Sequence, residues 1–281
     1  MKEEPLADYT IGAVYRYAAR VPGINPESTR LYSDRHVILI HGFNANYVGA
    51  AKSYDAFRKN IHDVAPGLND RITTLKWPGK LAYWDAVTRA SGDAAHVLAG
   101  FLEASSVGFR GELVFIAHSL GCRLVLEALG KLAPAIRQTL LPRIRLFLMA
   151  AAVPTAFLAA GGPLRQTVED CARAEIFFSK TDQALGLVFS VGQWAELGYW
   201  SEAVGLKGAP QDLWGRRRHD MTGYLHGTYW TSETVAYRIA LALRAAKKRP
   251  MSRQDMKDRI QAKRAPSGRD LPRRLMGSRG I

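Results

Sequence analysis

The segment from Glu112 to Leu129 places a short apolar run before a turn of small residues and then a helical pattern. The turn is the pentapeptide Ala-His-Ser-Leu-Gly at 117–121. A small-x-Ser-x-small sequence between a strand and a helix is typical of a nucleophile elbow. The serine of such a turn takes a strained backbone conformation, and larger residues beside it would clash. We therefore expect Ser119 at the N-terminus of a helix, where the helix dipole favours an oxyanion.

A second apolar run, His36 to Ile40, ends in the sequence His-Gly-Phe-Asn at 41–44. An oxyanion hole in an elbow-type site uses the N–H of the residue after the nucleophile and an N–H from the loop after an earlier strand. We expect Leu120 to supply the first donor. Phe43 is expected to supply the second through its amide, because Gly42 lets the backbone approach a substrate oxygen. The alternatives are a helix-capping serine at the elbow and a simple turn here.

Short apolar runs alternate with helical patterns along the body of the chain. Apolar side chains spaced by three and four residues predict helices within 87–102, 125–132 and 235–243. Single helices between short strands predict an α/β fold, with a mostly parallel, doubly wound sheet covered on both faces. Functional residues of such a sheet lie at the carboxyl ends of its strands. The predicted strands are 36–40, 71–76, 112–117, 144–150 and 174–179.

The acid of a serine triad on this fold follows the nucleophile in the chain and lies just after a late strand. Asp182 follows the predicted strand 174–179 and meets this requirement. Asp170 precedes the same strand, so it lies at the wrong end. Asp220 is the second choice, and Glu202 is a further acid in the same long segment, residues 183–225. The alternative role for Asp182 is to cap the helix that begins after it.

The chain has seven histidines, and two of them, His219 and His226, follow the acid. His226 lies in a glycine-flanked loop before the last helix, where a general base can reach the serine. His219 follows three arginines and is expected on the surface or in a strand. His118 lies inside the elbow, and its side chain is expected to point away from Ser119. Three residues are further candidates for contact with a substrate: His41, His118 and Trp77, the last equally expected in the core.

Six short segments together carry a resemblance to a known family: His36–Asn44, Trp77–Gly79, Tyr83–Asp85, Ile116–Gly121, Ser179–Asp182 and His226–Trp230. They are similar to segments of a bacterial, esterase/lipase-like alpha/beta-hydrolase family long catalogued as a domain of unknown function. The similarity covers residues 34–245, and the Trp-Pro turn followed by Tyr-Trp-Asp is its most distinctive part. The resemblance implies the alpha/beta-hydrolase fold and the following site: Ser119, Asp182 and His226 as the triad, with Phe43 and Leu120 as the oxyanion hole.

The net charge of +14 is concentrated at the C-terminus. Residues 244–281 hold 13 Lys and Arg against 3 Asp and Glu. We expect a hydrolase domain over 1–249 and a disordered basic tail over 250–281, either solvated or in weak contact with nucleic acid or an anionic membrane. Residues 183–225 precede the predicted catalytic histidine in the chain. Their aromatic residues predict an insertion that covers the site.

The cysteines and the glycine pattern argue against a disulfide framework, a metal site and a nucleotide-binding loop. Cys122 and Cys171 are expected to be reduced core thiols, and neither has a partner at metal-ligand spacing. The chain has no glycine-rich phosphate loop and no dinucleotide fingerprint, so no metal or cofactor is expected. Met1–Pro5 is acidic and no apolar stretch is long enough to span a bilayer, which predicts a cytoplasmic protein.

These features predict a serine hydrolase that cleaves a small-molecule or lipid ester through an acyl-enzyme. Two alternatives remain open at this point. One is a hydrolase fold without activity that serves as a binding module. The other is a protein that binds nucleic acid or an anionic surface through its basic tail. The sequence predicts neither the acyl chain nor the oligomeric state.

Overall fold

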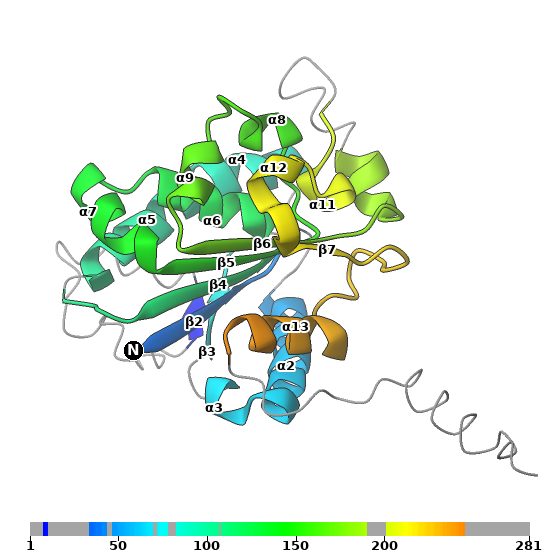
Figure 1. Cartoon of the computed structure of the whole chain (residues 1–281), viewed down its shortest axis with the longest axis horizontal. Coiled ribbons are helices and arrows are strands. Elements are labelled where there is room, and N and C mark those ends of the chain that lie inside the picture. The colour runs from blue at the N-terminus through cyan, green and yellow to red at the C-terminus, as the bar shows by residue number, and fades with distance from the viewer. Residues whose placement is uncertain are drawn as a thin grey trace, which may run out of the picture.

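The computed structural model describes residues 8–10, 34–43, 47–69, 72–77, 83–106, 108–189 and 201–244. Within these ranges seven strands form one sheet in the order β1-β3-β2-β4-β5-β6-β7, and all neighbouring strands are parallel (Figure 1). The strands are β1 (Asp8–Thr10), β2 (Arg35–Ile40), β3 (Ile72–Lys76), β4 (Glu112–His118), β5 (Ile144–Met149), β6 (Arg173–Phe178) and β7 (Arg218–Asp220).

Helices cover both faces of this sheet (Figure 1). One face carries α2 (Tyr47–Val64), α3 (Pro66–Asn69) and α13 (Glu233–Ala242), and α13 contacts α2. The other face carries α4 (Tyr83–Ser91), α5 (Asp93–Ser106) and α6 (Leu120–Gly130), which contact one another. The remaining elements are shorter: α7 (Pro134–Leu140), η2 (Leu141–Arg143), α8 (Thr155–Leu158), α9 (Arg165–Glu169), η3 (Ala184–Phe189), α11 (Val204–Lys207), α12 (Gln211–Trp214) and η4 (Gly215–Arg217).

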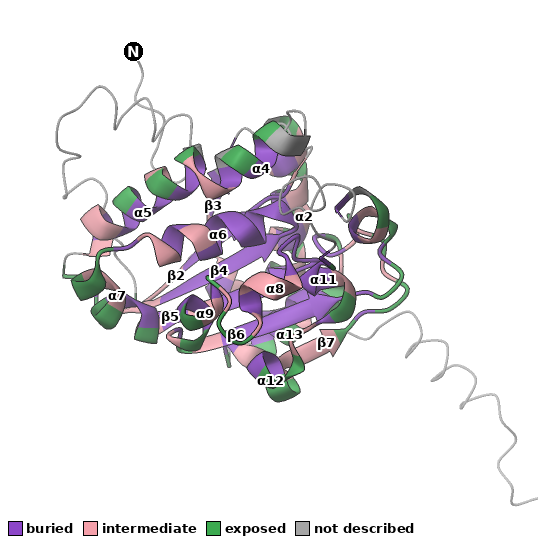
Figure 2. Ribbon diagram, turned by 90° about the horizontal axis from the view of Figure 1, so that it is seen from above, coloured by how far each residue is buried: buried purple, intermediate pink, exposed green. Residues whose placement is uncertain are grey.

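The core lies on both faces of the central strands, which Figure 2 shows as buried between the helices. In β4 every residue from Leu113 to His118 is buried. A strand covered on both faces needs apolar side chains at successive positions, which is why β4 reads as an apolar run and not as an alternating one. Fully burying one large apolar side chain such as Phe115 or Phe147 contributes about 1.5–3 kcal/mol.

The five predicted strands are confirmed, with ends that differ by one residue at most. Two strands were not among the five predicted, β1 and β7, although a strand was one of the two places expected for His219. Each has three residues, and β7 consists of Arg218, His219 and Asp220, so it has no apolar run. Since β7 is the last strand in the sheet order, it pairs with β6 alone. The final part of the predicted insertion, 183–225, therefore belongs to the sheet itself.

The predicted helices are also present, although α6 ends two residues and α13 one residue before the predicted patterns 125–132 and 235–243 end, and one pattern spans two helices. The apolar face over 87–102 belongs to two helices, α4 and α5, which meet at Gly92. A Cβ on Gly92 would lie 2.7 Å from the carbonyl oxygen of Thr88, so the glycine permits the close turn between the two helices.

Several other predictions concern the interior or the ends of the chain. Cys122 and Cys171 are buried and unpaired, as predicted, and burial raises the pKa of both thiols. Among the residues described, no helix is both long and apolar enough to cross a bilayer. The basic segment 250–281 lies outside the described residues, as does 190–200 of the predicted insertion.

Candidate active site

Ser119 occupies the turn between β4 and α6 in a strained backbone conformation. Its φ of 53° and ψ of −124° lie in a region that residues other than glycine rarely adopt. The end of β5 and the loop after it hold this conformation: the Ser119 amide donates to the Met149 carbonyl at 2.9 Å, and the Ser119 carbonyl accepts from the Ala152 amide at 3.1 Å. Its side chain makes no capping hydrogen bond to α6, so the alternative of a helix-capping serine is wrong.

Two glycines bring the elbow and the His-Gly loop into contact. A Cβ on Gly42 would lie 2.5 Å from Ser119 Cβ and 3.1 Å from its Oγ. A Cβ on Gly121 would lie 2.4 Å from the carbonyl oxygen of His41. A side chain at either position would therefore force the two loops apart. Gly42 and Gly121 therefore have to be small because of contacts between the two loops, and not only because of the tight turn within the elbow.

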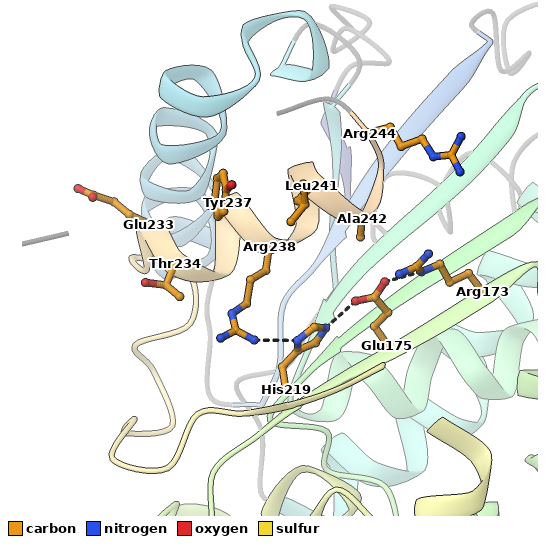
Figure 3. Close-up of a pocket in the computed structure, with 10 residues that line it drawn as sticks. All are labelled: Arg173, Glu175, His219, Glu233, Thr234, Tyr237, Arg238, Leu241, Ala242 and Arg244. Carbon is orange, nitrogen blue, oxygen red and sulfur yellow. Dashed lines mark hydrogen bonds and ion pairs between the residues drawn. The ribbon is translucent and has the colours of Figure 1, made fainter. Parts of the chain in front are cut away.

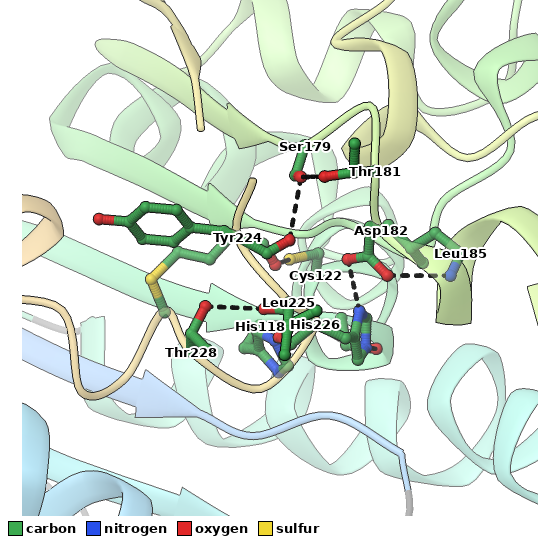
Figure 4. A network of polar contacts seen from close by, with 12 residues as sticks. His118, Cys122, Ser179, Thr181, Asp182, Leu185, Tyr224, Leu225, His226 and Thr228 are labelled. Carbon is green, nitrogen blue, oxygen red and sulfur yellow. Dashed lines mark hydrogen bonds and ion pairs between the residues drawn. The ribbon is translucent and has the colours of Figure 1, made fainter. Parts of the chain in front are cut away.

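His226 lies between Ser119 and Asp182, within hydrogen-bonding distance of both. Its Nδ1 is 2.8 Å from Asp182 Oδ2, a contact that Figure 4 shows. Its Nε2 is 2.9 Å from Ser119 Oγ. With the serine hydroxyl donating to Nε2, the ring proton resides on Nδ1 and is donated to the carboxylate. A nucleophile, a base and an orienting acid in this order can carry out acyl transfer.

Asp182 is 1% exposed and uses its two carboxylate oxygens differently. Oδ2 accepts from His226, whereas Oδ1 accepts from the amide of Leu185 at 3.1 Å. The helix-capping role and the pairing with histidine thus coexist in one side chain. The other candidate acids point elsewhere: Asp220 binds Thr222 through Oδ1 at 2.8 Å, and Glu202 forms an exposed ion pair.

The loop after β6, which carries Asp182, is joined to the loop after β7, which carries His226 (Figure 4). Besides the bond between His226 and Asp182, two hydrogen bonds connect these loops: Ser179 Oγ donates to the Tyr224 carbonyl at 3.0 Å, and the Gly223 amide donates to Thr181 Oγ1 at 2.9 Å. Short as it is, β7 therefore brings the histidine loop to the acid.

Ser119 and His226 line a cavity of about 390 Å³. Phe43 and Leu120, the predicted oxyanion donors, both line it. Phe189 also lines it, so the described part of the predicted insertion contributes to the wall. Further apolar contributions to the lining come from Ala152, Ala184, Leu185 and Trp230. Within the described ranges, no three His, Cys, Asp or Glu side chains gather as metal ligands would.

His41 lines the cavity, but its ring is committed to the protein. The Trp77 amide donates to His41 Nε2 at 3.1 Å, so the ring proton must be on Nδ1, which donates to the Gly42 carbonyl at 2.9 Å. That bond orients the peptide whose N–H belongs to Phe43, the predicted second oxyanion donor. Trp77 is fully buried, with its ring stacked on His41, and so it is a core residue behind the cavity wall.

His118 lines the cavity, as its candidacy for contact with a substrate requires, and its ring lies against the loop that carries His226. Its ring centroid lies 4.8 Å from that of His226, and its Nε2 donates to the His226 carbonyl at 2.7 Å (Figure 4). The predicted strand ended at 117, but β4 continues through His118 and directs this side chain to the returning histidine loop. Burial and then the neighbouring His226 lower the pKa of His118 to about 3, so this ring is neutral.

Replacing His118 by phenylalanine is expected to lower kcat for an ester about fivefold and to change KM little. The lost hydrogen bond is worth about 1 kcal/mol and holds the loop that carries His226. His118→Gln keeps a donor and should retain most of the activity. Steady-state kinetics of the three proteins measures this. Equal kcat for His118→Phe and wild type would show that the bond does not position His226.

Comparison with known proteins gives one family. The model of a family described as "Alpha/beta hydrolase of unknown function (DUF900)" matches residues 27–200, more than half of the chain. The matched range contains Ser119 and Asp182 and ends before His226. No curated protein sequence matches.

Three similar solved structures are bacterial. The ydeN gene product of B. subtilis is 15% identical with a TM-score of 0.42, over 74% of this chain and 97% of that one. An extracellular alpha/beta-hydrolase from a Paenibacillus species is 12% identical with a TM-score of 0.42, over 76% and 99%. Lipase BlEst2 of Bacillus licheniformis is 11% identical with a TM-score of 0.40, over 74% and 91%.

Proposed function

This chain belongs to the alpha/beta-hydrolase family of unknown function, and on that premise we propose that it is a serine hydrolase that cleaves acyl esters. One observation carries the proposal: Asp182, His226 and Ser119 form a continuous hydrogen-bonded series that opens onto a cavity. The strained φ of Ser119 supports it, because such strain persists in proteins mainly where function requires it.

In the first half of the reaction, Ser119 Oγ attacks the ester carbonyl carbon while His226 Nε2 accepts the hydroxyl proton. Asp182 stabilises the imidazolium through Nδ1. The amides of Phe43 and Leu120 stabilise the tetrahedral oxyanion, each donor contributing about 3 kcal/mol. Collapse of this intermediate breaks the bond to the alcohol oxygen, which takes the proton from His226 Nε2 and leaves.

In the second half, water attacks the acyl-enzyme and His226 accepts a proton from it. The carboxylic acid is released when Ser119 Oγ takes that proton back. The neighbouring ring of His118 is neutral, so it places no second positive charge beside the imidazolium. His118 therefore supports His226 as a base through its loop without opposing the charge that His226 gains.

The proposed substrate is a small-molecule or lipid ester. The cavity volume of about 390 Å³ falls in the lower part of the range of ligand sites. Its wall includes Phe43, Leu185, Phe189 and Trp230, which suit an acyl group and not a charged one. An alcohol is the proposed leaving group, although the same geometry serves thioesters, amides and acyl transfer.

Fluorophosphonate labelling followed by a panel of p-nitrophenyl esters tests this proposal. We expect a single label, located on Ser119 by mass spectrometry of the digested protein. Turnover should favour short acyl chains over long ones because of the limited cavity volume. The matching thioesters and anilides, run beside the esters, identify the leaving group. If the protein takes no label and cleaves none of these substrates, it has the hydrolase fold without hydrolase activity.

A further inference from the structure

A second cavity, of about 650 Å³, lies beside β6, β7 and α13 (Figure 3). It is larger than the cavity at Ser119 and shares no lining residue with it. Arg173 and Glu175 come from β6 and His219 comes from β7, whereas Tyr237 and Arg238 come from α13. The proposed hydrolase reaction uses none of these residues.

Glu175 forms the floor of this cavity and is 1% exposed. His219 Nε2 donates to one carboxylate oxygen at 2.6 Å, and Arg173 Nε donates to the other at 2.5 Å. Burial alone would raise the pKa of Glu175, but these two partners outweigh it and hold the pKa below its ordinary value. Glu175 is therefore a carboxylate whose charge is matched by Arg173.

Arg238 closes the network from the side of α13, where its Nη1 donates to His219 Nδ1 at 2.9 Å (Figure 3). Since a guanidinium has no acceptor, this bond requires the lone pair of the ring on Nδ1 and its proton on Nε2, where it is donated to Glu175. The network thus fixes the direction of Arg238 without neutralising its charge. Neither Arg238 nor Arg244 forms an ion pair with any described residue.

The lining of the cavity combines positive charge with apolar surface. Its second carboxylate, Glu233, projects from the far end of α13, away from His219 (Figure 3). Leu241 lines the same cavity and is 55% exposed, and Tyr237 lies between Leu241 and Glu233 on the helix. The open side of the cavity therefore offers an oriented guanidinium beside an apolar wall.

We propose that this cavity binds a small organic anion. Its carboxylate or phosphate head pairs with Arg238, because a guanidinium binds both oxyanions through charge-assisted hydrogen bonds. Its apolar part lies along Tyr237 and Leu241. The site is separate from Ser119, and the proposal does not depend on the hydrolase activity.

Isothermal titration calorimetry on the full chain tests the site, with hexanoate and hexyl phosphate as probes and hexylamine as the cationic control. Arg238→Gln is the central variant because glutamine can still donate to His219 Nδ1 but lacks the charge. Arg216→Gln, at an exposed position outside the cavity, is the matched control. We expect wild type and Arg216→Gln to bind at least one anion, and Arg238→Gln to bind it at least about tenfold more weakly.

A second variant, Leu241→Glu, places a negative charge on the wall without touching the network and should abolish anion binding. It covers the case in which Arg238→Gln fails to fold, which circular dichroism reports. Two results would overturn the proposal. One is the absence of binding by both anions. The other is equal affinity in wild type, Arg238→Gln and Leu241→Glu, which would place the anion elsewhere on the protein.

Discussion

Ser119→Ala is expected to lower ester turnover by about 10⁶-fold, the scale seen when a serine protease loses its nucleophile. The substitution removes Ser119 Oγ, which lies 2.9 Å from His226 Nε2. Without this oxygen no acyl-enzyme can form. Alanine keeps the Cβ that the elbow already accommodates, so the change in free energy of unfolding should be about 1 kcal/mol or less.

Turnover of a p-nitrophenyl ester and thermal unfolding, measured on the same sample, separate the two effects. Ser53→Ala is the matched control: Ser53 lines the same cavity, but its hydroxyl donates to the Gly49 carbonyl at 3.1 Å on α2. It should retain both turnover and fluorophosphonate labelling. A label that persists on Ser119→Ala would mean that another residue is the nucleophile.

Asp182→Asn is expected to lower kcat by about 10⁴-fold with a smaller effect on KM. Asparagine can keep its carbonyl oxygen on the Leu185 amide, so the helix cap is preserved. Its amide group then faces His226 Nδ1 and donates, which forces the ring proton onto Nε2. In that tautomer Nε2 cannot accept the serine proton, so the reaction loses its base.

Asp182→Ala provides a second comparison, since it removes the cap as well and should cost about 1 kcal/mol of stability beyond the loss of activity. Asp220→Asn is the control acid: Asp220 is exposed and bonded to Thr222, and its variant should keep turnover near the wild-type value. The kinetics of all three variants decide the assignment. A fast Asp182→Asn enzyme together with a slow Asp220→Asn enzyme would reverse it.

The features of this site that follow from sequence are those set by neighbours in the chain. The run before Ser119, the small residues around it and the helix after it lie within a few residues of one another, so their pattern predicts the elbow directly. The acid was harder to choose, because Asp182 and Asp220 both lie between Ser119 and His226 in the chain. Only the position of Asp182 after a visible apolar strand favoured it over the runner-up.

The bond from His118 to the loop of His226 was not predicted, because it depends on where one strand ends, and strand ends are set by pairing with neighbouring strands. β4 extends to His118 because this residue pairs with Met149 of β5. The role of Trp77 was left open for a related reason, since the choice between core and cavity wall depends on what packs against the side chain. In the folded chain that partner is His41, 36 residues earlier.

By itself, then, the sequence determined the α/β class, the five apolar strands and the segment that presents Ser119, because each depends on short-range patterns of burial and turn geometry. The tertiary structure alone decided which ring nitrogen of His41 and of His219 carries the proton, how β7 brings His226 to Asp182, and where the second cavity lies. Each of these depends on contacts between residues far apart in the chain. No local pattern encodes such contacts; they arise from the order and pairing of the strands.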